Sequence, residues 1–147
     1  MSLKNWSDNG WLVEHSASDT EIGDLLKIAD RDLRDCRVKG VSADWRFNIA
    51  YNAALQSSRA VLFACGYRAA REAHHHRVIQ SLGLTLKLPQ TDIKKFEMFR
   101  TKRNFSDYES AGAVSENEVL EMTLLAVRIR SEAESYLKLA RPGVFPL

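Results

Sequence analysis

The clearest pattern in the chain is a set of apolar stripes whose members are three or four residues apart, the spacing that places side chains on one face of a helix. The first stripe follows Ser18 and consists of Ile22, Leu26, Ala29, Leu33 and Cys36. Three residues after Ser18 comes Glu21, and together they form the sequence signature of a helix N-terminal capping box. The pattern predicts a first helix from Ser18 to about residues 38–40.

A second helix is predicted between Ser42, which can cap its N-terminus, and about Cys65, just before Gly66. Apolar residues lie on several sides of this segment, so we expect it to occupy the centre of the fold. A loop over residues 66–73 then leads to a shorter helix over about residues 74–82, which we expect Gly83 to end.

The second half of the chain predicts two more helices. The first opens at Pro89, and its pattern is broken at Gly112. Its inner edge carries Ile93, Phe96, Phe99 and Arg103. The second opens with another capping box, Ser115 with Glu118, and its apolar stripe continues without a gap until Pro142 ends it.

No segment shows the sustained alternation of apolar and polar residues that is typical of a strand. Four long helices and one short one therefore predict an all-α fold, an up-and-down four-helix bundle with one additional short helix. We expect an irregular N-terminal arm over residues 1–18, anchored by Trp6 and Trp11, the bundle over residues 19–141, and a flexible tail over residues 142–147.

Composition narrows the class of protein. The chain has 147 residues and is 45% hydrophobic, which suits one domain with a proper core. A net charge of only +2 excludes a protein that is basic throughout, although it allows a local basic patch. The chain contains no long apolar run, and Cys36 and Cys65 lie inside helical patterns. We therefore expect a cytoplasmic protein with reduced thiols, no membrane association, no metal and no cofactor.

The segment over residues 99–108 carries the most unusual set of polar residues. On a helix Arg100, Arg103 and Asp107 share one face, and Arg103 lies beside the apolar edge. One interpretation is that Asp107 neutralises Arg103, because an unpaired charge at the edge of a core is unfavourable. The other is that Arg100, Lys102 and Arg103 hold a phosphate, whose oxygens match the forked donors of arginine. In that case Tyr108 would stack on a base or donate a hydrogen bond.

A second polar set, Asn48, Tyr51 and Asn52, lies on the predicted central helix. Buried amides need hydrogen-bond partners, so we favour a role in bracing a neighbouring helix. The alternative is that these residues line the same cleft as Arg103.

Three consecutive histidines, His74, His75 and His76, open the short helix. Neighbouring residues on a helix point in different directions, so we do not expect the three to share a metal ion. We expect His75 to be a half-buried packing residue.

Two segments resemble the HEPN superfamily of small helical bundles: RNFSDY over residues 103–108 and SADWRFNIAYNAAL over residues 42–55. The resemblance covers about residues 19–140. Ribonuclease members of that superfamily carry an arginine, often followed by asparagine, and a histidine four to six residues after the arginine. Two such motifs usually meet across a homodimer cleft, where they promote attack of the RNA 2′-hydroxyl on its own phosphate without a metal. By this resemblance, Arg103 corresponds to the arginine of the motif, Asn104 to the asparagine, and Tyr108 to the histidine.

Tyr108 is the departure that matters for activity. An unperturbed tyrosine has a pKa of about 10, so it is a poor general base at neutral pH, where histidine works well. Related HEPN-like proteins also show an Asp-Tyr pair at this point, and many of them are regarded as non-catalytic partners of nucleotidyltransferases in toxin–antitoxin pairs. The resemblance thus implies a homodimer with a nucleotidyltransferase-type antitoxin as candidate partner.

These expectations combine into one main hypothesis and two alternatives. The main hypothesis is a catalytically degenerate RNA- or nucleotide-binding component of a toxin–antitoxin or related defence or stress system. Its cleft would be lined by Arg103, Asn104 and Tyr108. The first alternative is a metal-independent endoribonuclease that uses Arg103 and Tyr108, and the second is a purely structural protein-interaction module.

Overall fold

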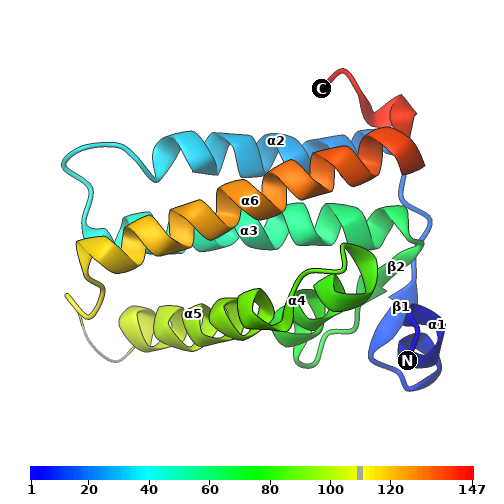
Figure 1. Cartoon of the computed structure of the whole chain (residues 1–147), viewed down its shortest axis with the longest axis horizontal. Coiled ribbons are helices and arrows are strands. Elements are labelled where there is room, and N and C mark those ends of the chain that lie inside the picture. The colour runs from blue at the N-terminus through cyan, green and yellow to red at the C-terminus, as the bar shows by residue number, and fades with distance from the viewer. Residues whose placement is uncertain (109–110) are drawn as a thin grey trace.

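The computed structural model of the chain is an all-α bundle and describes residues 1–108 and 111–147, with the backbone alone for residues 105–108 (Figure 1). In this described part, the four long helices are α2 (Asp19–Asp35), α3 (Ala43–Ala64), α5 (Gln90–Tyr108) and α6 (Glu116–Ala140), and the short one is α4 (His74–Thr85). The predicted all-α helical bundle is therefore confirmed, and the N-terminal arm adds a second short helix, α1 (Leu3–Asp8). None of these described helices is both long and apolar enough to cross a membrane.

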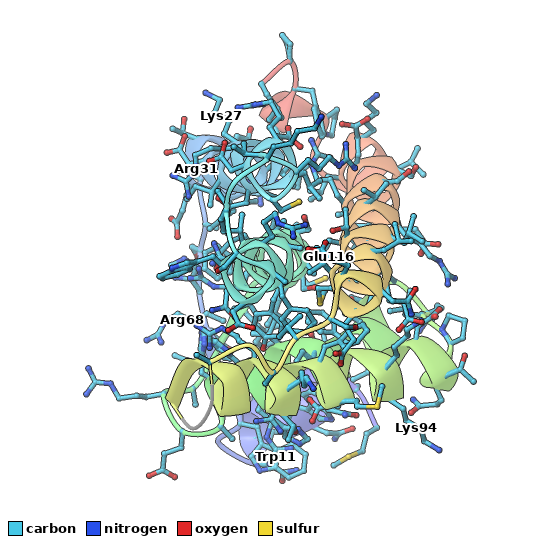
Figure 2. The ribbon with its side chains drawn as sticks, turned by 90° about the vertical axis from the view of Figure 1, so that its left-hand side faces the viewer. Trp11, Lys27, Arg31, Arg68, Lys94 and Glu116 are labelled. Atoms are coloured by element: carbon cyan, nitrogen blue, oxygen red, sulfur yellow. The ribbon has the colours of Figure 1, made fainter. Side chains whose placement is uncertain are left out.

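The central helix is α3, as its several apolar sides predict. It packs on α2, α6, α4 and α5, and Figure 2 shows it between α2 above and α5 below, with α6 to the right. Small buried residues such as Ala50, Ala53 and Ala54 let these neighbours approach closely. The principal helix contacts in the described part do not join α2 to α4 or α5. One side of α3 therefore stays uncovered between them, and it carries half-buried polar residues.

The N-terminal arm is more regular than the sequence suggests. It contains α1 (Leu3–Asp8), which is capped by Ser2, and β1 (Leu12–Glu14), which pairs antiparallel with β2 (Tyr67–Ala69). The predictions of an irregular arm and of no strand were wrong, because three-residue strands are too short to show alternation. The anchors are those predicted: Trp6 is buried, and its ring lies 5.7 Å from that of Trp11.

Two helix ends also differ from expectation. Gly83 does not end α4 but lies inside it, where an added Cβ would come within 3.2 Å of Ile93 Cδ1. The glycine therefore permits the close approach of α5 rather than a chain reversal. After α6, the tail forms a single 3₁₀ turn, η1 (Pro142–Val144), whose Val144 is buried in one cluster with Ile22. The tail predicted to be flexible thus packs on α2 through this valine.

The serine caps lie where they were predicted. Ser18, Ser42 and Ser115 each accept a hydrogen bond from the backbone amide three residues later. The capping box is reciprocal at Ser115, because Glu118 Oε1 accepts from the Ser115 amide at 3.0 Å. At Ser18 the carboxylate of Glu21 instead contacts His15 Nε2 at 2.5 Å. This contact ties α2 to the segment that follows β1.

Candidate functional site

A pocket of about 450 Å³ lies between the N-terminus of α4 and the second half of α5. It is lined by Ala73, His74, His75, His76, Arg100, Arg103 and Asn104. Three of the residues singled out in the sequence, Arg100, Arg103 and Asn104, therefore come together here. The histidines that join them come from a different helix.

The start of α4 is unusual among the helices of this chain. Its N-cap is Ala73, which adopts a left-handed conformation with φ 52° and ψ 35°, and no side chain caps the helix. Its first turn also contains no acidic residue. The first amide N–H groups of a helix lack partners within the helix, and together they carry a partial positive charge. The pocket therefore has a helix N-terminus of the kind that binds anions.

Two arginines on α5 add full positive charge to this pocket. The Cζ atom of Arg103 lies 5.3 Å from the centre of the Tyr51 ring, a cation–π geometry that fixes the guanidinium over a buried phenol. Arg100 Nη2 donates to Glu97 Oε2 at 3.1 Å, and the same oxygen lies 3.1 Å from His76 Nδ1. Glu97 thus positions the residues of one wall of the pocket, while Arg100 Nε stays buried without a hydrogen-bond partner.

The hydroxyl group of Tyr51 helps to position His75. Its Oη lies 3.2 Å from His75 Nδ1, and its ring makes an edge contact with Phe96 at 5.5 Å. Burial, together with the positive charge of Arg103, lowers the pKa of His75 to about 4. Burial likewise raises the pKa of Tyr51 above its ordinary value. At neutral pH the imidazole is therefore neutral and the phenol protonated.

His74 is also neutral at neutral pH. Burial lowers its pKa, and so do the positive charges of Arg59 and Arg68. Arginines and the helix N-terminus consequently supply positive charge at the pocket, and the imidazoles of His74 and His75 serve as neutral donors or acceptors.

Other predicted site residues lie elsewhere. Lys102 points to α6, where its Nζ lies 3.4 Å from Glu118 Oε2, so it does not join Arg100 and Arg103. Asn52 Nδ2 donates to Asp32 Oδ2 of α2 at 2.7 Å, which is the bracing role that the sequence favours. Asn48 is half-buried on α3 and is not among the residues that line the pocket.

The interpretation that pairs Arg103 with Asp107, and every role given to Tyr108, falls outside the described residues. Both side chains belong to the last turn of α5, where the backbone alone is described.

Sequence reasoning missed the part that His74 and His76 play in this pocket. A usable signal was present at the start of the helix, because no Ser, Thr, Asp or Asn stands at position 73 and basic-type residues replace the acidic ones that usually occupy a first turn. Their adjacency in sequence suggests comparing the histidines only with one another as metal ligands, whereas Arg100 and Arg103 line the same pocket. In the described part of the chain, no group of three or more His, Cys, Asp or Glu is placed to hold a metal ion.

Comparison of the chain with protein-family models, with curated proteins and with solved structures finds no match. The function is therefore argued from the pocket and from the sequence resemblance alone.

Proposed function

We propose that the chain is a HEPN-like protein whose pocket binds a phosphate group of RNA or of a nucleotide, without catalysis, as a component of a toxin–antitoxin or related defence or stress system. The observation that carries the proposal is the meeting of Arg100, Arg103 and the uncapped N-terminus of α4 in one pocket. Each of these three elements attracts an anion by a different physical route.

The geometry suits phosphate better than a lone carboxylate. Arginine presents several N–H groups in a planar fork, and the α4 amides approach from a second direction, so three phosphate oxygens can be satisfied at once. The neutral rings of His74 and His75 can donate to the same group or stack on a base. Asn104 is exposed at the rim, where its amide can reach a base edge or a ribose hydroxyl.

The binding proposal is tested by fluorescence anisotropy of a labelled single-stranded RNA at two salt concentrations. We expect Arg103→Gln to weaken binding about tenfold or more, because a charge-assisted hydrogen bond contributes about 1.5–3 kcal/mol. The control is Arg128→Gln, since Arg128 lies on α6 beside Asp92 and Glu132 and away from the pocket. Binding should weaken steeply with salt. Absence of binding at either salt concentration would support the interaction-module alternative instead.

A homodimer is the oligomeric state that we propose with this function. Leu120, Leu124 and Val127 share one face of α6 and are each more than a third exposed, as is Met98 on α5. Exposed apolar residues gathered on one face favour a protein contact. Light scattering coupled to size-exclusion chromatography should give twice the monomer mass, and Leu124→Glu should return the monomer. Co-purification with a nucleotidyltransferase would support the toxin–antitoxin role.

One observation favours the endoribonuclease alternative, with His75 in place of Tyr108. The His75 imidazole is neutral at neutral pH and lies in the Arg103 pocket. If Nδ1 donates to Tyr51 Oη, Nε2 can accept the proton of an RNA 2′-hydroxyl. The 2′-oxygen would then attack the adjacent phosphorus, and the bond to the 5′-oxygen would break. The products are a 2′,3′-cyclic phosphate and a 5′-hydroxyl that gains a proton.

Incubation of the protein with RNA in the presence of EDTA distinguishes the two functions. Under the binding proposal no cleavage occurs. Cleavage that is lost in both His75→Gln and Arg103→Gln, and lost on a 2′-deoxy substrate, would establish the nuclease instead. Cleavage that survives in His75→Gln would exclude His75 as its base.

A further inference from the structure

Beyond the pocket, arginines and aromatic rings, two of them buried, follow one another along α3. The row begins where Arg103 covers the Tyr51 ring at 5.3 Å. The Tyr51 ring lies 5.9 Å from that of His75, and the His75 ring lies 5.5 Å from that of His74. Single-stranded nucleic acids bind surfaces on which phosphates meet cations and bases stack on accessible rings. Here the buried Tyr51 ring supports Arg103, and the half-buried rings of His74 and His75 are the ones that a base can reach.

The row continues two turns further along α3. The Cζ atom of Arg59 lies 5.2 Å from the centre of the Phe63 ring, and Phe63 in turn contacts the His15 ring at 4.7 Å. Tyr51 and Arg59 are eight residues apart on the same helix, which corresponds to about 12 Å along its axis. That span matches about three to four nucleotides at the rise of about 3.4 Å per nucleotide in a stacked strand.

The surroundings of Arg59 favour a bound anion. Its Nη1 donates to Gln56 Oε1 at 2.6 Å, but its Nε is buried without a hydrogen-bond partner. Among the described residues no carboxylate lies within ion-pair distance of it, and Glu21 acts only from further away. A half-buried guanidinium without a carboxylate is unfavourable unless another negative group approaches it.

Arg68 supplies a second cation at this end of the row. It lies on β2, is exposed, and has no ion pair among the described residues. Figure 2 shows Arg68 projecting on the same side of the molecule as Arg31 of α2, with α3 between their levels. The charges of Arg59 and Arg68 both act on His74, so this end of the row is continuous with the pocket.

We propose that Arg59 and Arg68 form a second phosphate-binding position, so that the protein holds a single-stranded RNA segment of about four nucleotides with one phosphate at Arg100 and Arg103 and a later one at Arg59 and Arg68. The inference rests on the proposed function and names its substrate class. Because Arg59 is half-buried on α3, a flexible single strand can approach it closely, whereas the backbone of a stiff duplex cannot. A mononucleotide occupies the first position only.

The test compares ligand lengths. Affinities are measured by competition for uridine monophosphate, a single-stranded hexauridylate and an RNA duplex of six base pairs. We expect the hexamer to bind at least tenfold more tightly than the mononucleotide and than the duplex. In the double variant Arg59→Gln/Arg68→Gln, affinity for the hexamer should fall about tenfold, while affinity for the mononucleotide stays within twofold. The slope of log affinity against log salt concentration should become shallower by about 1–2 for the hexamer.

Two further variants distinguish failure of the second phosphate position from failure of the proposed function. Arg59→Lys/Arg68→Lys preserves the charge and should keep most of the hexamer affinity, which separates loss of charge from loss of packing. Arg103→Gln should weaken mononucleotide and hexamer alike. If hexamer and mononucleotide bind equally, or if Arg59→Gln/Arg68→Gln binds the hexamer like the parent, the second position is disproved while the first stands. If no RNA or nucleotide binds the parent, the proposed function itself is disproved.

Discussion

The two sides of α5 differ in how their positive charges are neutralised. On the side facing α6, each cation lies beside a carboxylate of the neighbouring helix, as in the pairs Lys95–Glu121, Lys102–Glu118 and Arg128–Asp92. On the side facing α3 and α4, Arg100 and Arg103 lie among histidines and a tyrosine. Of the ion pairs described on this side, only Glu97 supplies negative charge, and it is shared between Arg100 and His76.

This difference between the two sides of α5 indicates which side binds a ligand. The α5–α6 seam is electrically complete within the chain, and what it leaves exposed is apolar, including Met98 and Leu124. The opposite side brings Arg100 and Arg103 together with a helix N-terminus that no side chain caps. A net charge of +2 does not reveal this contrast, because it gives no information about where the arginines and carboxylates lie.

The largest effect is expected from a core residue of α5 that lies beside the pocket. Phe96 is fully buried and supports the Tyr51 ring, so Phe96→Ala should lower the free energy of unfolding by about 3–5 kcal/mol. The matched control is Met98→Ala two residues away, which is 60% exposed and should change stability by at most about 0.5 kcal/mol. Urea denaturation measures both. Equal losses would mean that the outer side of α5 is buried in solution, as in a dimer.

The next effect bears directly on the charge contrast. Arg100→Gln/Arg103→Gln should weaken binding of single-stranded RNA by about 100-fold, from two lost contacts of about 1.4 kcal/mol or more each. Lys95→Gln/Lys102→Gln removes the same charge from the seam and should leave affinity within about threefold, as screened long-range attraction requires. Anisotropy titrations at fixed salt give both values. Equal weakening by the two double variants would show that only net charge matters and that Lys102 belongs to the site after all.

A smaller effect should appear in the pH dependence of stability. The pKa of His75 falls from 6.5 to about 4 on folding, so the unfolded chain binds this proton more tightly than the folded one. Stability should therefore decrease as the pH falls from about 6.5 to about 4, and this contribution should level off below that. The half-buried ring limits its size to the order of 1–2 kcal/mol.

Carboxylates also titrate in that window, so the difference between two proteins isolates the histidine. Thermal unfolding from pH 7 to pH 4 should show a flatter profile for His75→Gln than for the parent, because glutamine can keep a hydrogen bond to Tyr51 Oη without titrating. Parallel profiles for the two proteins would place the His75 pKa near its ordinary value.

Much of the fold was predictable because long helices repeat their pattern many times. The stripe that follows Ser115 continues for seven turns, and the serine caps fix three helix starts within a residue. The pairing of Leu12–Glu14 with Tyr67–Ala69 was not predictable, because it joins two three-residue segments more than 50 positions apart. The prediction that Gly83 ends its helix was wrong for a related reason. A glycine is needed there because Ile93 approaches closely, and sequence spacing does not reveal that contact.

The site was predictable only on the helix where its motif lies. Spacing on one helix groups Arg100 with Arg103 but gives no information about which residues of α4 face them. It also groups Lys102 with them by proximity in sequence, although Lys102 lies on the other side of the helix beside Glu118. The histidines entered the site through tertiary packing, by way of the Tyr51–His75 contact.

The smallest expected effects concern the helix starts on the two sides of α5. Ser115 caps α6 beside the neutral seam, and Ser115→Ala should lower stability by about 1 kcal/mol. At the uncapped α4, Ala73→Asp should instead raise stability by about 0.3–1 kcal/mol at low salt, because a carboxylate there meets the helix dipole, and aspartate tolerates the left-handed conformation. Differential scanning calorimetry at low and high salt resolves both changes.

The same Ala73→Asp substitution is expected to change both the stability of the protein and its affinity for RNA. An internal carboxylate at the mouth of the pocket occupies the place of the ligand's phosphate, so the variant should gain stability and lose affinity for RNA together. Ala73→Asn is the matched control, because it changes the shape without the charge and should keep most of the affinity. A stabilised Ala73→Asp variant that binds RNA as well as the parent would show that the anion lies away from the α4 N-terminus, which would leave the arginines of α5 alone as the phosphate site.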